Sequence, residues 1–98
     1  MLFIATDTRT YFDMTHFLQS MKLDPEEKIA EFTAGFALWI DHLGKMYGIP
    51  PDERFAVDAA TGHSLAEESF ALPFLCYADP VFGVYLLDSM SQMLLTGI

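Results

Sequence analysis

Three histidines and one cysteine are the residues of this chain best suited to metal or nucleophilic chemistry. Asp13 and His16 stand three residues apart, a spacing that places both on one face of a helix. His42, His63 and Cys76 are scattered, and none of the histidines belongs to a paired ligand motif such as H-E-x-x-H. We therefore expect isolated histidines, with His63 solvated in a loop, rather than a metal site or a Cys–His nucleophile.

The adjacent acidic pairs Glu26-Glu27 and Glu67-Glu68 also lack the geometry of an acid–base pair. Neighbouring residues on a helix do not face each other, and carboxylates in a first turn stabilise the helix dipole. Cys76 lies in the apolar segment FLCYA, which is typical of a buried structural thiol. The six glycines form no phosphate loop, and no G-x-S-x-G motif is present. We expect no enzyme, cofactor or metal; an enzyme whose site the sequence does not reveal is the alternative.

The charge balance is strongly acidic, with 14 acidic and 5 basic residues and a net charge of -9. Such a surface opposes direct contact with nucleic acid or anionic membranes and favours a protein partner with a basic surface. The single cysteine forbids an internal disulfide, and the N-terminus lacks a secretory pattern, so we expect a cytoplasmic protein. The apolar stretch 69–87 is interrupted by Pro73 and by Asp79-Pro80, and we do not expect it to span a membrane.

The clearest elements predict an all-α fold, a small bundle of four or five helices in a single domain over residues 1–98. Residues 25–47 are expected to form one helix, capped by Asp24 and opened by Pro25. Residues 80–96 repeat that start with Asp79 and Pro80. The first helix shows an apolar stripe expected to face the core, namely Ile29, Phe32, Phe36, Trp39, Ile40, Leu43, Met46 and Tyr47.

The remaining segments are less distinct. A helix beginning after Thr10 is expected from the helical spacing of its apolar residues, and another after Ser64, ending or kinked near Pro73. Residues 51–60 fit either a short helix or a strand within RFAVDA. The N-terminal LFIA fits a short strand or an extended arm, and a strand there needs a partner from RFAVDA or from another subunit.

The C-terminal helix is apolar nearly all round. One arc is expected to be core and contains Phe82, Leu86, Leu87, Met90, Met93 and Leu94. The opposite side carries a single charge, and we expect it to be a protein interface formed by Val81, Val84, Tyr85, Asp88 and Leu95. Burial within the chain's own bundle and contact with a membrane are the alternatives. With 52% apolar residues, a 98-residue monomer has more apolar surface than its core can hide.

These features predict a non-catalytic protein-binding module, such as an inhibitor, immunity-type factor, adaptor or assembly chaperone. It would bind through an apolar helical face with an acidic rim, and a homodimer is expected. The alternative is a phage-type acidic mimic of nucleic acid, which requires carboxylates converging on one face. The acidic surface is expected to include Glu26, Glu27, Glu31, Asp52, Glu53, Glu67 and Glu68.

Overall fold

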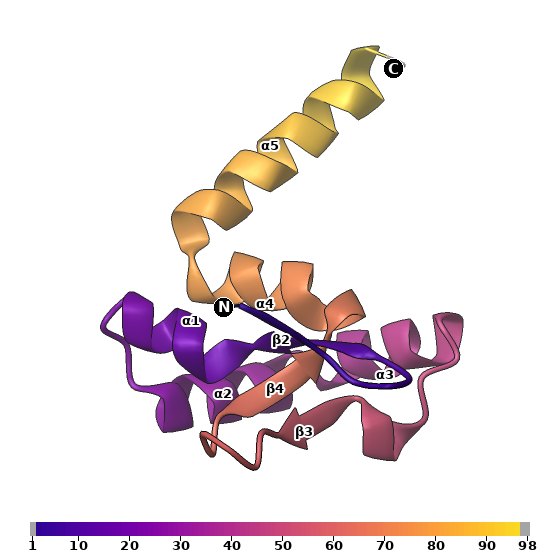
Figure 1. Ribbon diagram of the computed structural model, residues 1–98. Helices are drawn as coiled ribbons and strands as arrows, with labels where there is room; N and C mark the ends of the chain where they lie inside the picture. The colour runs from indigo at the N-terminus through magenta and orange to yellow at the C-terminus, as the bar shows by residue number, and fades with distance from the viewer. Residues whose placement is uncertain (1, 97–98) are drawn as a thin grey trace.

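A four-stranded antiparallel sheet lies at the centre of the fold, so the expected all-α bundle is wrong. A computed structural model describes residues 2–96 (Figure 1). Besides the sheet, these residues form five α-helices and two short 3-10 helices. The elements in chain order are β1 (Phe3–Ala5), β2 (Thr10–Asp13), α1 (Met14–Ser20), α2 (Pro25–Gly35), α3 (Ala37–Met46), η1 (Pro51–Glu53), β3 (Phe55–Val57), β4 (Ser64–Glu67), η2 (Glu68–Phe70), α4 (Ala71–Ala78) and α5 (Pro80–Thr96).

The sheet has the order β1-β2-β4-β3, with every neighbouring pair antiparallel. Phe12 of β2 faces Phe3 on one side and Ala66 of β4 on the other. The expected arm at LFIA is therefore a strand whose partner is β2, neither RFAVDA nor another subunit. RFAVDA contributes β3, and the helical alternative at 51–60 is reduced to η1.

Two expected helix starts are instead strands. Thr10–Asp13 is β2, because Thr, Tyr and Phe favour extended backbone, and α1 begins only at Met14. Its cap is Asp13, whose Oδ1 accepts a hydrogen bond from the His16 amide at 2.8 Å. Ser64–Glu67 is β4, and the Glu67 carboxylate accepts from the Ser69 amide at 2.8 Å at the start of η2.

Pro73 lies inside α4 and causes neither of the expected disruptions. The helix begins at Ala71, so Pro73 occupies its first turn, where a backbone N–H has no partner within the helix. The expected helix 25–47 is instead divided into α2 and α3 at Phe36. Gly35 and the hydrogen bond from the Thr33 hydroxyl to the Ile29 carbonyl weaken the helix just before this break.

The core is an aromatic cluster between the sheet and the helices. Phe74 of α4 packs against the rings of Phe12, Phe17 and Phe32, with centroid separations of 5.1–6.2 Å. Four phenylalanines, at positions 12, 32, 70 and 74, are almost completely buried. The fold thus rests on segments from β2 to α4, and α5 lies outside this cluster.

Arg54 fixes the joint between α3 and η1. Its Nε donates to the Ile49 carbonyl at 3.0 Å and its Nη1 to the Asp41 carboxylate at 3.3 Å, and the residue is buried. Gly44 of α3 leaves the space for the guanidinium, since a Cβ there would lie 2.3 Å from Arg54 Cζ. A side chain at position 44 must therefore displace a buried, hydrogen-bonded cation.

Gly44→Ala is expected to lower the free energy of unfolding by about 1–3 kcal/mol, because overpacking and loss of the Arg54 hydrogen bonds combine. Urea unfolding followed by circular dichroism measures the change. Gly35→Ala is the matched control, since a Cβ at position 35 meets nothing within 4 Å. Equal stabilities of the two variants would contradict the packing role of Gly44.

Candidate protein-binding surface

Helix α5 projects away from the rest of the protein (Figure 1). Its axis is turned by 110° from that of the preceding Glu68–Ala78 segment. The radius of gyration is 14.3 Å, with extents of 47 × 33 × 24 Å. A compact chain of this length is expected to have a radius of gyration of about 12.6 Å. The protein is therefore an elongated body in which α5 forms an arm.

Two local features set the direction of this arm. The Asp79 carboxylate accepts a hydrogen bond from the Phe82 amide at 3.1 Å, which confirms Asp79 as the cap of the C-terminal helix. Gly83 is buried against α4, and a Cβ at this position would lie only 2.9 Å from the Cys76 carbonyl oxygen. The close approach of α5 to α4 therefore depends on the absence of a side chain at Gly83.

The side of α5 expected to form a protein interface is exposed. Val81 is 82% exposed and Leu95 is 86% exposed, and Val84, Tyr85 and Asp88 are also in the exposed class. The expected core arc is wrong for much of its length, because Leu87, Met90, Met93 and Leu94 are exposed as well. Periodicity identified an apolar face, but no part of the described chain covers it.

An apolar groove occupies the angle between α5 and the body. Its volume is about 610 Å³. The wall comes from α3, from Phe36 just before it, and from α4 and α5. Its residues are Phe36, Trp39, Leu72, Pro73, Cys76, Pro80, Gly83, Val84, Leu86, Leu87 and Met90. None of these residues is charged, so the groove matches an apolar ligand surface rather than a basic one.

Most of the groove was not anticipated from the sequence. Trp39, placed in the core by the helical stripe, is 68% exposed and lines the groove instead. Met46 and Tyr47 of the same stripe are also exposed. Cys76, expected to be a buried thiol, is half-buried in the groove wall. One feature of the sequence did indicate an exposed apolar surface on α3, namely the adjacent apolar pair Leu38-Trp39. This pair makes the apolar face of α3 wider than packing against a single neighbouring element requires.

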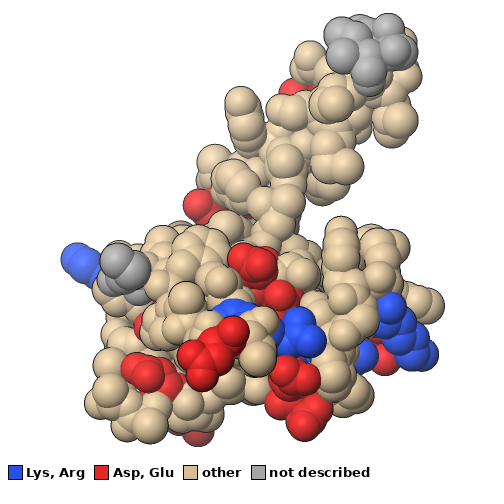
Figure 2. Space-filling view, turned by 45° about the vertical axis from the view of Figure 1, so that its right-hand side comes forward, with Lys and Arg blue, Asp and Glu red and all other residues tan. Residues whose placement is uncertain are grey.

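The acidic residues are spread over the body rather than gathered on α5. Figure 2 shows α5 with few charged atoms, while red and blue groups alternate over the body on the face in view. Several carboxylates are paired, such as Glu53 with Arg9 at 3.1 Å and Asp41 with Lys45 at 2.9 Å.

The expected acidic surface is only partly realised. Glu26, Glu27 and Glu31 lie exposed along α2, Asp52 and Glu53 lie on η1, and Glu68 is exposed on η2. Glu67 is 5% exposed and does not belong to the surface, because its carboxylate caps η2. These residues come from three separate elements, without the single continuous array that a phosphate mimic requires.

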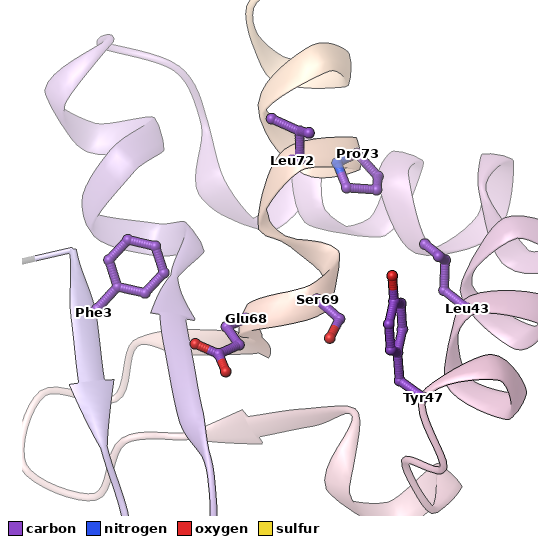
Figure 3. A pocket seen from close by; sticks show the side chains of 7 residues that line it. All are labelled: Phe3, Leu43, Tyr47, Glu68, Ser69, Leu72 and Pro73. Carbon is purple, nitrogen blue, oxygen red and sulfur yellow. The ribbon is translucent and has the colours of Figure 1, made fainter.

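A second hollow lies on the other side of Leu72 and Pro73, with a volume of about 620 Å³ (Figure 3). It contains the polar side chains of Tyr47, Glu68 and Ser69. The Glu68 carboxylate points toward Phe3, away from the Tyr47 hydroxyl (Figure 3). Within residues 2–96, no hydrogen bond joins these three side chains, so the hollow has no nucleophile held by a base.

Asp13 and His63 form the clearest pair of titratable side chains. His63 Nδ1 lies 2.8 Å from Asp13 Oδ2, so His63 is anchored rather than solvated as expected. Asp13 is buried and also caps α1 through its other oxygen. No serine or cysteine side chain of residues 2–96 hydrogen-bonds to this imidazole. The pair therefore ties the loop before β4 to the start of α1.

No metal centre is formed by the described residues: between positions 2 and 96, no three His, Cys, Asp or Glu side chains gather closely enough to bind a metal ion. His16 is exposed on α1 and His42 is exposed on α3, whereas Cys76 lies on α4. Between positions 2 and 96, no single helix is long and apolar enough to cross a membrane. The segments Glu68–Ala78 and Pro80–Leu95 have that length and hydropathy only when taken together, and a bend of 110° separates them.

Tyr77 connects α4 to α2 beside the groove. Its hydroxyl donates a hydrogen bond to the Glu31 carboxylate. Burial, followed by this hydrogen bond and the Glu31 charge, raises the pKa of Tyr77 to about 12. The Tyr77 hydroxyl, together with Lys28, lowers the pKa of Glu31.

Tyr77→Phe is expected to change how stability depends on alkaline pH. The folded pKa of Tyr77 lies above its ordinary value of 10.0, so the neutral phenol stabilises the fold below pH 10. This contribution is lost as the pH rises through about 12. Urea unfolding at a series of alkaline pH values should show a steeper loss of stability in the wild type than in Tyr77→Phe. Tyr47→Phe, at an exposed tyrosine, should follow the wild type; parallel curves for all three would contradict the role of the Tyr77–Glu31 bond.

Comparison of the chain with family models, curated proteins and solved structures gives no match.

Proposed function

We propose that this chain is a non-catalytic protein-binding module whose binding element is α5. The observation that carries the proposal is the exposure of apolar side chains on both sides of this helix. Contiguous exposed apolar patches on proteins mark interaction sites, since leaving them in water is unfavourable. An adaptor, an inhibitor and an assembly chaperone all require such a surface.

The division of charge supports the same proposal. The apolar arm supplies the area that gives affinity, and the acidic body beside it sets the encounter rate and the choice of partner. A partner that also contacts the acidic body needs a basic surface there, whereas contact confined to the nearly uncharged α5 needs only an apolar one. We place the protein in the cytoplasm, in keeping with its single, half-buried free cysteine.

The test is to make exposed positions of α5 polar, one of which, Val84, also lines the groove. In the triple variant Val84→Ser, Tyr85→Ser, Leu95→Ser, all three positions are exposed. Surface substitutions change stability little, and we expect the body to unfold within about 1 kcal/mol of the wild type. Association, measured by light scattering for the pure protein and by affinity capture from a lysate, is expected to be lost.

Val57→Ser is the matched control, because Val57 is equally exposed but lies on β3, away from α5. This variant should associate like the wild type. If the triple variant keeps every association of the wild type, α5 is not the binding element and the proposal fails.

A further inference from the structure

We infer that the groove between α5 and the body is occupied by α5 of a second copy of this chain, in a two-fold symmetric dimer. This inference rests on the proposed function, because it names the partner of the same binding element. Three independent features carry it: the area left exposed, the absence of charge, and the geometry of the arm.

The exposed area matches what one side of a dimer interface buries. The accessible surface of the chain is 6550 Å². A compact monomer of 11.0 kDa is expected to expose about 5600 Å². The excess is roughly 900 Å², and a standard protein–protein interface buries about 800 Å² on each partner. A single contact along the arm therefore brings each copy to the exposure of a compact protein.

The distribution of charge selects a second copy over a basic partner at this particular groove. None of the groove residues is charged. Between positions 79 and 96, Asp79 and Asp88 are the only charged side chains of an otherwise strongly acidic chain. Two acidic copies repel wherever their bodies meet, and they come together at least cost where neither carries charge. An uncharged groove also offers a basic ligand no carboxylate to pair with.

The geometry prevents α5 from filling the groove of its own chain. The 110° bend holds the arm away from α3, and the contact of Gly83 with the Cys76 carbonyl fixes the base of the arm. A helix is about 10–12 Å across with its side chains and rises 5.4 Å per turn. The groove volume of about 610 Å³ therefore accommodates about one turn of a helix. Since α5 cannot fill the groove of its own chain, the occupant that offers the same exposed, nearly uncharged helix is a second copy.

A two-fold arrangement satisfies both chains at once. Each arm lies along the groove of the other, so the contact is isologous and closes after two copies. The side of α5 that lines the groove, including Leu87 and Met90, then contacts its equivalent. Trp39, exposed in one copy, is covered by the arm of the other. Large aromatic side chains at the centre of an interface commonly dominate its affinity.

The experiment measures self-association of the purified chain, residues 1–98, by sedimentation equilibrium, with Trp39 fluorescence as a second readout. Trp39 is the single tryptophan, so its emission reports directly on the groove. We expect a dimer whose formation shifts this emission to shorter wavelength as the concentration rises. We also expect dimerisation to tighten with added salt, because salt screens the repulsion between the acidic bodies.

The variant Leu87→Gln, Met90→Gln makes the groove side of α5 polar and is expected to weaken dimerisation by at least about 100-fold, roughly tenfold per side chain. Leu38→Gln is the matched control: Leu38 is exposed on α3 but does not line the groove, and the variant should dimerise like the wild type. Circular dichroism verifies that all variants remain folded.

Several results would overturn the inference. One is a chain that stays monomeric at the highest concentrations measured, and another is a dimer that responds to Leu38→Gln but not to the Leu87, Met90 variant. A monomer that binds vesicles of neutral phospholipid would assign the arm to a bilayer instead. A monomer that captures a different protein through α5 would reject this inference and leave the proposed function standing. If every α5 variant keeps both the self-association and the protein capture of the wild type, the inference and the proposed function are both rejected.

Discussion

Phe74→Ala is expected to lower the free energy of unfolding by about 3–5 kcal/mol, the range for a buried phenylalanine replaced by alanine. Phe74 is completely buried and contacts the rings of Phe12, Phe17, Phe32 and Tyr77. Removing it leaves a cavity where the sheet, α1, α2 and α4 meet. A small domain is stable by about 5–15 kcal/mol, so the variant should lose a large part of its stability and can be partly unfolded at 37 °C.

Urea unfolding, with the midpoint and the slope both recorded, measures this loss. Leu72→Ala is the matched control, because Leu72 lies on the same helix but is half-exposed. The control should lose about 1 kcal/mol or less. A Phe74→Ala variant as stable as the control would mean that the aromatic cluster is not the core of the fold.

The two helix starts marked by Asp-Pro were predictable because their signals are local. Asp24 and Asp79 accept hydrogen bonds from amides two and three residues ahead, and Pro25 and Pro80 fit the first turn wherever the helix lies in the fold. The tertiary setting of these helices was not encoded in the same residues. The break at Phe36 and the exposure of α5 both depend on what packs nearby.

The sheet was missed because its strands are short and its pairing is non-local. A four-residue strand such as Thr10–Asp13 gives too few positions to distinguish an alternating pattern from a helical one. Its identity as a strand is settled by Ala66 and Glu67, which lie far along the chain and were themselves assigned to a helix. Because both segments were assigned to helices, neither was available as the strand that pairs with the other.

The candidate site was predicted in part. An exposed apolar side of the last helix followed from its lack of charge, and Val81, Val84, Tyr85 and Leu95 lie on it. The groove did not follow, because a sequence pattern shows that a face is apolar without showing the direction in which the helix leaves the body. That direction depends in part on Gly83, whose role is visible only beside the Cys76 carbonyl.

Gly83→Ala is accordingly expected to disturb the groove while leaving the body folded. The added Cβ would lie 2.9 Å from the Cys76 carbonyl oxygen, and a backbone atom within α4 cannot rotate away as a side-chain end can. The arm must therefore shift or turn at Asp79, which changes the spacing between α5 and α3. Since the core lies between β2 and α4, we expect the urea midpoint of the body to change little.

Self-association is expected to weaken by at least about tenfold, or 1.4 kcal/mol, because a complementary groove tolerates little displacement of one wall. Sedimentation equilibrium of Gly83→Ala measures the effect, with Gly35→Ala as the matched control. The control makes the same glycine-to-alanine change at a position with open space around it. The two variants separate the cost of filling a contact from any general effect of alanine on helices. Undiminished dimerisation of Gly83→Ala, with an unchanged Trp39 emission shift, would show that the approach of α5 to α4 does not shape the groove.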